Sequence, residues 1–421
     1  MKTVWIINEY AGAPKYGMEF RHYYIGRELV RRGYNVWIIS ASHSHLFYSS
    51  PKVEESFQIE QIDGINYLWV KVPYYSNSID KRRGLKWLIF TLKVYQFLPY
   101  PVLDKPDTII VSPMATFPII AAYKWAKRFN AQLIYEIRDI WPLTLIELGG
   151  YSPNHPIIKL MDWCERFGYK KADRVVSLLP LAYSHMEKKG LELEKFIYIP
   201  NGTCMDEYFQ LEKNFNSVQS NLLEEAKKFK IQLDSILSKI EDKFTIIYGG
   251  SFGTSNGLEY LILAMELLKK YSQIHLLLVG KGAMEDKLKR MVSQKGLTNI
   301  TFIPSVPKRI LLPLLRKADV CYIGLKRKNL FRFGISPNKL FDYLYVEKPV
   351  IWAIDAGFNP VESANCGISV EPDNPEAIAN GILNIYNLPS KERYQMGVNG
   401  KKYLLQYHTY KKIVDLFESI F

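Results

Sequence analysis

Cysteine is scarce in this chain. Its four residues, Cys164, Cys204, Cys321 and Cys366, lie far apart and form no CxxC pair. This spacing argues against a disulfide framework and a zinc site, and it favours a reducing compartment. The seven histidines show no HExxH or other paired spacing, so we expect no metal. The sequence also lacks a GxSxG elbow, a Walker A loop and a kinase signature, which argues against the enzymes that those motifs define.

Long apolar runs are missing too. No stretch reaches the about 18 uninterrupted apolar residues of a membrane span. The apolar run in Met1–Tyr10 is too short for a signal peptide and is typical of a first buried strand. Hydrophobic residues make up 48% and aromatic residues 14% of the 421 residues, which predicts two or three globular domains. The formal charge of +13 favours an anionic partner.

Apolar runs of strand length alternate with helical patterns in both halves, which predicts an α/β fold with parallel sheets. A turn at residues 199–202 divides two doubly wound domains, residues 1–200 and 201–402. Residues 214–242 are polar and predict a helical insertion, and Tyr403–Phe421 predicts a terminal helix. The expected strands are Val4–Asn8, Val36–Ser40, Thr108–Ser112, Leu133–Ile137 and Arg174–Leu178, then Phe244–Tyr248, His275–Val279, Ile300–Ile303, Val320–Ile323 and Val350–Ala353.

The segment Gly334–Ile351 predicts a loop, a short helix, a turn and a buried strand. Ser336 suits an N-cap and Pro337 the first helical position. Free N–H groups at such a helix start attract phosphate, and a carboxylate at Asp342 could accept hydrogen bonds from a ribose diol. The segment therefore indicates a sugar-nucleotide site made from Gly334, Ile335, Ser336, Pro337, Asn338, Lys339 and Asp342.

Two glycine-rich turns follow strands of the second half. The turn at residues 248–257 would let backbone N–H groups approach a phosphate, although it lacks the full dinucleotide fingerprint and could be a plain turn. In the turn at residues 279–282, Lys281 either faces phosphate or is solvated. A cationic loop precedes Gly334 and is either functional or a solvated surface. The candidate donor-binding residues added here are Gly250, Ser251, Asn256, Lys281, Arg327 and Arg332.

In the first half, Glu136, Arg138 and Asp139 stand at a strand end. Three charged groups there are costly to desolvate without a purpose, and sites of α/β sheets gather at such edges. The alternative is an Arg–carboxylate pair that stabilises a loop. Gly17 and Arg21 belong to the first βα loop, where Arg21 is either a phosphate contact or a surface cation.

Residues 85–103 are rich in aromatic and aliphatic side chains, with Lys86 and Lys93 among them and Asp80–Arg83 before them. A cationic, apolar segment of this kind suits the interface plane of a bilayer. A buried core helix explains the same pattern equally well.

Taken together, these motifs resemble the family-four retaining glycosyltransferases of the GT-B fold. The resemblance covers nearly the whole chain. It implies two Rossmann-like domains facing a central cleft, with the last helix crossing back onto the N-terminal domain. The matching segments are residues 27–36, 137–142, 199–202, 277–282, 302–307, 334–351, 371–377 and 400–403.

The closest branch by resemblance builds bacterial surface polysaccharides, such as O-antigen or capsule, and includes WbuB-type amino-deoxysugar transferases. This implies transfer of a sugar, of a deoxy or N-acetylamino type, from a UDP-linked donor to a lipid-linked or saccharide acceptor. The acceptor would bind the N-terminal domain and the donor the C-terminal domain. The expected location is the inner face of the cytoplasmic membrane, on an anionic surface, with neither a cofactor nor nucleic acid as partner.

The chain departs from the family pattern at five positions. The first of two glutamates separated by seven residues is replaced by Gly334, and the second by Asp342. The family's phosphate-binding Arg and Lys are replaced by Ser251 and Asn256. We therefore expect diphosphate neutralisation by Arg327, Arg332 or Lys339. The fifth change puts Arg138 where a histidine is common.

Retaining transfer requires stabilisation of the leaving diphosphate more than a strong base. We expect Asp139 to orient the acceptor hydroxyl or take its proton, with Glu136 in reserve. A sugar-nucleotide epimerase on the same architecture and a non-enzymatic basic binding protein for membrane or nucleic acid are the alternatives.

Overall fold

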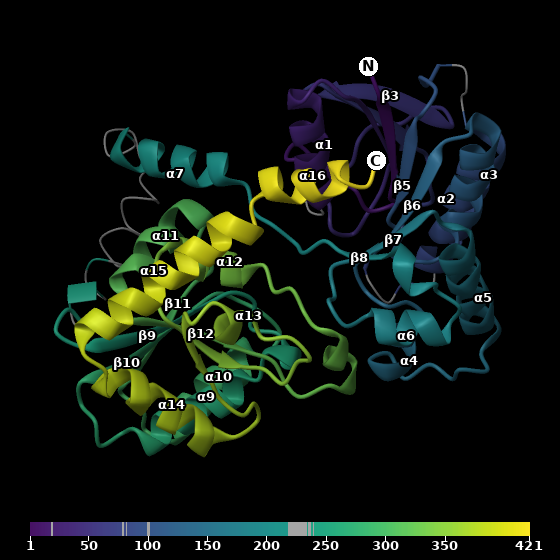
Figure 1. Ribbon diagram of the computed structural model, residues 1–421. Coiled ribbons are helices and arrows are strands. Elements are labelled where there is room, and N and C mark those ends of the chain that lie inside the picture. The colour runs from purple at the N-terminus through teal and green to yellow at the C-terminus, as the bar shows by residue number, and fades with distance from the viewer. Residues whose placement is uncertain are drawn as a thin grey trace. The chain divides into compact units, whose positions relative to one another are not determined.

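The computed structural model describes residues 1–17, 20–77, 80, 82–98, 102–217, 234, 237, 238 and 240–421. The chain divides into two compact units (Figure 1). Unit 1 contains Met1–Gly202, Phe333–Ser336 and Tyr410–Phe421, and unit 2 contains Thr203–Arg332 and Pro337–Thr409. Each unit is described by itself below.

Unit 1 is built on a sheet in the order β3-β4-β2-β1-β5-β6-β7-β8. All neighbouring strands are parallel except β3 and β4. Continuous apolar runs such as Val4–Ile7 are fully buried, as expected for a sheet covered on both faces. The strands are β1 (Thr3–Ile7), β2 (Asn35–Ala41), β3 (Phe57–Ile62), β4 (Ile65–Val70), β5 (Thr108–Val111), β6 (Gln132–Ile137), β7 (Arg174–Ser177) and β8 (Phe196–Tyr198).

The antiparallel hairpin β3–β4 was not expected from the sequence. Its turn is Asp63-Gly64, and both residues have positive φ angles, of 50° and 81°. An Asp-Gly pair is favoured in a two-residue hairpin because both positions need that conformation. The sequence carried this signal, but apolar and polar residues alternate only weakly in β3, which lies half-exposed at the sheet edge.

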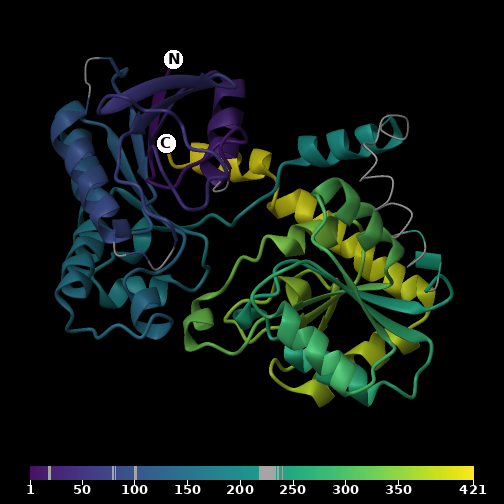
Figure 2. The ribbon, with the colours of Figure 1, turned by 180° about the vertical axis from the view of Figure 1, so that it is seen from behind.

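Helices cover the unit 1 sheet, and Figure 2 shows them from behind. The first, α1, packs against the chain's last helix, α16: the Tyr24 and Tyr410 rings stack at 4.7 Å, and Arg32 pairs with Asp415 at 2.9 Å. The helices are α1 (Arg21–Arg31), α2 (Arg82–Phe97), α3 (Pro118–Phe129), α4 (Leu143–Glu147), α5 (Pro156–Lys171), α6 (Tyr183–Lys188), η1 (Leu193–Lys195) and α16 (Tyr410–Glu418).

Unit 2 contains a parallel sheet in the order β11-β10-β9-β12-β13-β14. The chain runs outward from β9 through β10 to β11, and then returns to β12 on the other side of β9. This reversal makes a topological switch point between β9 and β12. The strands are β9 (Phe244–Gly249), β10 (Ile274–Val279), β11 (Ile300–Ile303), β12 (Val320–Gly324), β13 (Val350–Ala353) and β14 (Gly367–Ser369).

The expected terminal helix, Tyr403–Phe421, is wrong as one element. The structure ends α15 at Tyr407 and begins α16 at Tyr410. At the break, the backbone N–H of Thr203 donates to the carbonyl of His408 at 2.7 Å, so that carbonyl leaves the helical ladder. The predicted insertion at residues 214–242 lies mostly outside the described residues.

The helices of unit 2 complete the fold around this sheet. They are α7 (Met205–Ser217), η3 (Thr254–Asn256), α9 (Leu258–Leu267), α10 (Glu285–Gln294), α11 (Lys308–Lys317), η4 (Asn329–Phe333), α12 (Lys339–Tyr345), α13 (Pro360–Ser363), α14 (Pro375–Asn387) and α15 (Ser390–Tyr407), and the last residue of η4 belongs to unit 1. Within the described part, no helix is long and apolar enough to cross a bilayer.

All four cysteines are buried and none forms a disulfide. Burial raises the pKa of the Cys164 and Cys366 thiols to about 12. Thiols in such surroundings are poor nucleophiles, because the thiolate is the reactive form. The cysteines therefore contribute as small apolar side chains of the cores.

Candidate functional site

The turns after β9 and β10 pack closely at the carboxyl edge of the unit 2 sheet. A Cβ on Gly280 would lie 1.8 Å from the carbonyl oxygen of Gly250, and a Cβ on Gly282 would lie 2.6 Å from that of Phe252. The backbone N–H of Phe252 also donates to the carbonyl of Lys281 at 2.9 Å. Only glycine fits at positions 280 and 282, and this packing fixes the backbone next to the switch point.

Lys339 reaches this edge from the first turn of α12. Its Nζ donates to the hydroxyl of Tyr248 at 2.7 Å and to the Oδ1 of Asn256 at 3.2 Å. Tyr248 and Asn256 both donate in turn to the carbonyl of Ser251, at 2.7 and 3.0 Å. A Cβ on Gly250 would lie 3.1 Å from Nζ. The ammonium is thus held beside the β9 turn at the switch point.

The surroundings of Lys339 are neutral. Within the described ranges, no carboxylate forms an ion pair with its ammonium, whose recorded partners are a phenol and an amide. Burial lowers the pKa of Lys339 from 10.5 to about 8. An ammonium in this setting gains by meeting an external anion, because the anion would restore the stabilisation that burial removes.

Asp342 lies in the first turn of α12, three residues after Lys339, and its side chain already contacts two other groups of unit 2. Its Oδ1 accepts from the hydroxyl of Tyr208 at 2.6 Å and pairs with the Nζ of Lys308 at 2.9 Å. No contact of Oδ2 is recorded within the described residues, and the side chain is 18% exposed. One carboxylate oxygen is therefore fixed by the protein, while the other can accept hydrogen bonds from hydroxyl groups of a ligand.

The predicted helix start is wrong by two residues. The α-helix α12 begins at Lys339, and the cap position is Asn338, whose side chain makes no capping hydrogen bond. Ser336 was expected as the N-cap, but Pro337 precedes the helix instead of opening it; the backbone N–H of Leu340 donates to the Pro337 carbonyl at 3.0 Å. Ile335 and Ser336 belong to unit 1 rather than unit 2. The start of this seven-residue helix therefore carries no capping side chain, and Lys339 supplies the positive charge of its first turn.

The other predicted cations face acids or solvent. Arg327 is about half exposed, and it pairs with Glu371 at 2.9 Å and with Asp355 at 3.1 Å. Arg332 is exposed and donates to the carbonyl of Asn329 at 2.6 Å. Lys281 is exposed. Of the residues expected to neutralise a diphosphate, Lys339 alone combines burial with neutral partners among those the structure describes.

In unit 1, Glu136 forms a buried charge cluster with α1. Its Oε1 pairs with Arg21 at 3.0 Å and its Oε2 meets the Nε2 of His22 at 2.8 Å, with exposures of 0%, 5% and 1%. Burial alone would raise the pKa of Glu136, but the charges of Arg21 and His22 outweigh it and hold the pKa well below its usual range. This is the stabilising pair that the sequence left open, with Arg21 rather than Arg138 as the partner.

Arg21 also binds the segment that follows β8, the last strand of the unit 1 sheet. Arg21 Nη1 donates to the carbonyl of Pro200 at 2.9 Å and to the Oδ1 of Asn201 at 3.3 Å. Arg21 was expected as a phosphate contact or a surface cation, but its guanidinium is buried and satisfied within the unit. Asp139 is exposed just beyond the end of β6, and Arg138 beside it is half-buried.

Two family models match most of the chain. The model described as glycosyl transferase 4-like domain matches residues 17–202, and the model of glycosyl transferases group 1 matches residues 230–403. The chain belongs to the GT-B glycosyltransferases of family four.

Relatives and solved structures agree with this assignment. The glycosyltransferase is 24% identical over 372 residues, or 86% of each chain, to WcaI of Escherichia coli K12, described as a colanic acid biosynthesis glycosyl transferase. Sucrose-phosphate synthase from Thermosynechococcus elongatus matches with a TM-score of 0.69 and 17% identity, covering 100% of this chain and 98% of that one. HepE from Anabaena, solved with UDP, matches with a TM-score of 0.65 and 14% identity, covering 100% and 99%. The predicted GT-B fold is therefore confirmed.

Gly334, where the resemblance described above implies a glutamate, has a backbone reason to be glycine in this glycosyltransferase. Its φ is +102°, and a Cβ would lie 2.7 Å from the Cδ of Pro180 in the same unit. A glutamate would therefore need a different loop conformation. Gly17 is constrained in the same way, with φ +114° and Tyr48 Cδ1 at 2.9 Å from its would-be Cβ.

Sequence reasoning missed Glu9, which follows β1 at the switch point of the unit 1 sheet. Its Oε1 accepts from the backbone N–H groups of Met114 and Ala115, each at 3.2 Å, while Oε2 is buried without a recorded partner among the described residues. Burial raises the pKa of Glu9. The available signal was an acidic residue directly after the first strand, which alternation alone does not distinguish from a surface residue.

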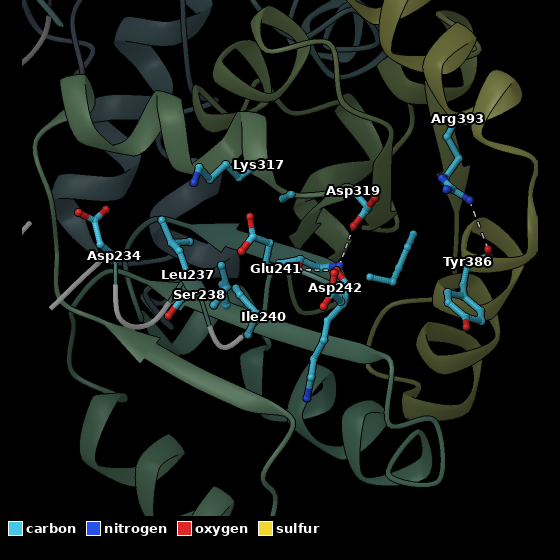
Figure 3. Close-up of a pocket in the computed structure, with 15 residues that line it drawn as sticks. Asp234, Leu237, Ser238, Ile240, Glu241, Asp242, Lys317, Asp319, Tyr386 and Arg393 are labelled. Atoms are coloured by element: carbon cyan, nitrogen blue, oxygen red, sulfur yellow. Dashed lines mark hydrogen bonds between the residues drawn. The ribbon is translucent and has the colours of Figure 1, made fainter. Parts of the chain in front are cut away.

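A cavity of about 790 Å³ lies at the opposite, amino-terminal edge of the unit 2 sheet (Figure 3). Its polar groups serve the local structure: Asp319 accepts from the backbone N–H of Thr245 at 2.8 Å, and Arg393 donates to the carbonyl of Tyr386 at 3.3 Å. Within the described residues, no cluster of three or more His, Cys, Asp or Glu side chains could hold a metal. The candidate donor site is therefore the carboxyl edge around Lys339.

Proposed function

We propose that this glycosyltransferase moves a sugar, with retention of anomeric configuration, from a UDP-linked donor to a lipid-linked or saccharide acceptor of surface polysaccharide. The single observation that carries the proposal is the half-buried ammonium of Lys339, held at the unit 2 switch point by neutral groups. The name of WcaI, which refers to colanic acid biosynthesis, supports the polysaccharide assignment. The structures of HepE with UDP support the choice of nucleotide.

The donor diphosphate would bind at the β9 turn, with Lys339 as its principal cation. Ser251 and Asn256 occupy the positions where the family's arginine and lysine are expected, and Asn256 now orients the Lys339 ammonium instead of carrying a charge itself. The ribose hydroxyls would meet the Oδ2 of Asp342. In this proposal, the positive charge that binds the diphosphate comes from Lys339 of α12 and not from the turn after β9.

In the transfer step, the acceptor hydroxyl oxygen forms a bond to the anomeric carbon while the bond from that carbon to the diphosphate oxygen breaks. The bonding electrons move to the diphosphate, whose added charge the Lys339 ammonium stabilises. The hydroxyl proton passes to the departing diphosphate or to Asp139. The proposal assigns that role to Asp139 because it is exposed, whereas Glu136 is buried in its ion pair.

The donor assignment is tested by calorimetry with UDP, uridine and a set of UDP-sugars, followed by product analysis. We expect UDP to bind far more tightly than uridine, and one UDP-sugar to be consumed only when a lipid-linked acceptor is present. Conversion of the donor to another sugar nucleotide without acceptor would instead show the epimerase. Absence of any nucleotide binding would overturn the proposal.

A further inference from the structure

Helix α2 has two apolar faces, although a core helix needs only one. Its inner face carries the buried side chains of Trp87, Phe90 and Val94. The other face is a stripe at helical spacing that remains in solvent: Leu85 is 50% exposed, Leu88 44%, Leu92 53% and Tyr95 39%. The buried face fits the core-helix interpretation of this segment, and the exposed stripe is the part that this interpretation does not explain.

Helix α3 lies beside α2 in unit 1 (Figure 1) and adds positive charge. Lys124 Nζ donates to the carbonyl of Tyr95 at 2.5 Å and lies 4.2 Å from the centre of its ring. Lys127 and Arg128 are exposed on the same helix. Neither α2 nor α3 contains an aspartate or a glutamate, although Asp80, just before α2, pairs with Arg82 at 2.8 Å.

Helix α5 continues this surface on the far side of α3. The rings of Tyr123 and Phe167 lie 5.2 Å apart, and those of Phe167 and Trp163 lie 5.6 Å apart. Trp163 is 54% exposed and Leu160 46%. Lys159, Arg166 and Lys170 border these two residues on the exposed side of the helix, and Arg166 pairs there with Asp162 at 2.8 Å.

We propose that the exposed sides of α2, α3 and α5, here called the docking face, bind an anionic lipid bilayer. Leucine, tyrosine and tryptophan side chains would enter the interface, and the surrounding cations would meet lipid phosphates. The complementary charge identifies the occupant, because the exposed cations Lys127 and Arg128 of α3 lie beside the apolar stripe of α2, and neither helix contains an acid. The docking face rests on the proposed function only for the lipid-linked acceptor, which would be met at that bilayer.

The experiment is flotation of the full-length protein with two kinds of vesicle, one of phosphatidylcholine alone and one of equal parts phosphatidylglycerol and phosphatidylcholine. We expect binding to the anionic vesicles, weakened by salt. The double variant Leu88→Glu/Leu92→Glu should weaken it by at least about tenfold, because each change removes an inserting side chain and adds repulsion. Leu267→Glu is the matched control: Leu267 is 48% exposed but belongs to unit 2, and its change should have no effect.

A second pair of variants tests the charge separately from the apolar stripe. Lys127→Gln/Arg128→Gln should weaken binding at low salt and reduce its salt dependence. Thermal melting checks that each variant is folded, and UDP calorimetry checks the donor site. Equal binding of wild type and Leu88→Glu/Leu92→Glu would overturn the docking face, as would self-association of the wild type that those substitutions abolish while vesicle binding persists. If the wild type binds anionic vesicles but not UDP, the proposed function is overturned and the docking face stands.

Discussion

At the carboxyl edge of the unit 1 sheet, Glu136 contacts Arg21 and His22, and the guanidinium of Arg21 matches the charge of the carboxylate. At the carboxyl edge of the unit 2 sheet, the Lys339 ammonium meets only a phenol and an amide among the described residues. Removing one partner of a matched buried pair is costly, because it leaves the other charge buried without compensation. A half-buried ion that is solvated by neutral dipoles can still gain from a ligand of opposite charge.

The largest effect is expected from breaking the matched cluster. Glu136→Gln should lower the free energy of unfolding by about 3–5 kcal/mol, because it leaves Arg21 buried without its counter-charge. Urea denaturation measures the change. The control is Glu285→Gln, which removes an exposed pair with Lys289 and should cost about 0.5 kcal/mol or less. Equal midpoints for the two variants would contradict the structural role of Glu136.

Removing the unmatched cation should have the opposite consequence for stability. Lys339→Met should reduce UDP affinity by roughly 10- to 100-fold, since a charge-assisted contact is lost, while uridine affinity stays unchanged. The same variant should melt at a higher temperature than wild type at neutral pH, because burial penalises the ammonium. Calorimetry and thermal melting measure both. Lys287→Met, which changes an exposed lysine of α10, should alter neither; a lower melting temperature for Lys339→Met would argue that the lysine is structural.

The pH dependence of UDP affinity and of stability tests the same role of Lys339. Burial lowers the pKa of Lys339 to about 8 from 10.5, so the ammonium is charged at pH 7 and loses its proton above about pH 8. UDP affinity of the wild type should therefore fall as pH rises through 8. Between pH 8 and 10.5 the unfolded chain binds the proton more tightly, so the stability penalty from Lys339 should shrink. In Lys339→Met both dependences should flatten; an unchanged pH profile would exclude Lys339 as the group responsible.

A moderate effect on nucleotide affinity is expected at Asp342, the proposed ribose contact. Asp342→Asn keeps an oxygen for Tyr208 but removes the charge that attracts hydroxyl donors. Affinity for uridine and for UDP should fall by the same factor, about tenfold, whereas competition by inorganic diphosphate should be unaffected. A selective loss of diphosphate binding would place Asp342 near the phosphates instead.

The smallest effect is expected at Arg327, although the sequence made it a candidate for the diphosphate. Its guanidinium is shared between Glu371 and Asp355 at the surface, so Arg327→Ala should change UDP affinity by less than about threefold. A loss as large as that of Lys339→Met would show that the acids release the arginine when the donor binds.

The strands were the most predictable part of this chain, because their apolar runs are long and bounded by turns. Ile300–Ile303 and Val350–Ala353 were located to the residue. The half-exposed strand β3 was missed because its pattern is weak. Its turn, Asp63-Gly64, would have revealed the hairpin.

Contacts between distant residues were beyond the sequence. Nothing in the spacing shows that Lys339 reaches Asn256, which is 83 positions away in the chain, or that Arg21 and not Arg138 pairs with Glu136. The sequence predicted charged residues at the sheet edges. It could not say which charges are matched inside the protein, because that depends on the packing of α1 and α12.

The buried cysteines described above give the chain an internal reporter. A thiol reagent in water cannot reach Cys164, Cys321 or Cys366 while their surroundings stay closed, since all three side chains are at most 2% exposed. Labelling must wait for the polypeptide to open. Because Cys164 belongs to unit 1 and the other two to unit 2, the order in which they are labelled reports which unit opens first, without any introduced cysteine.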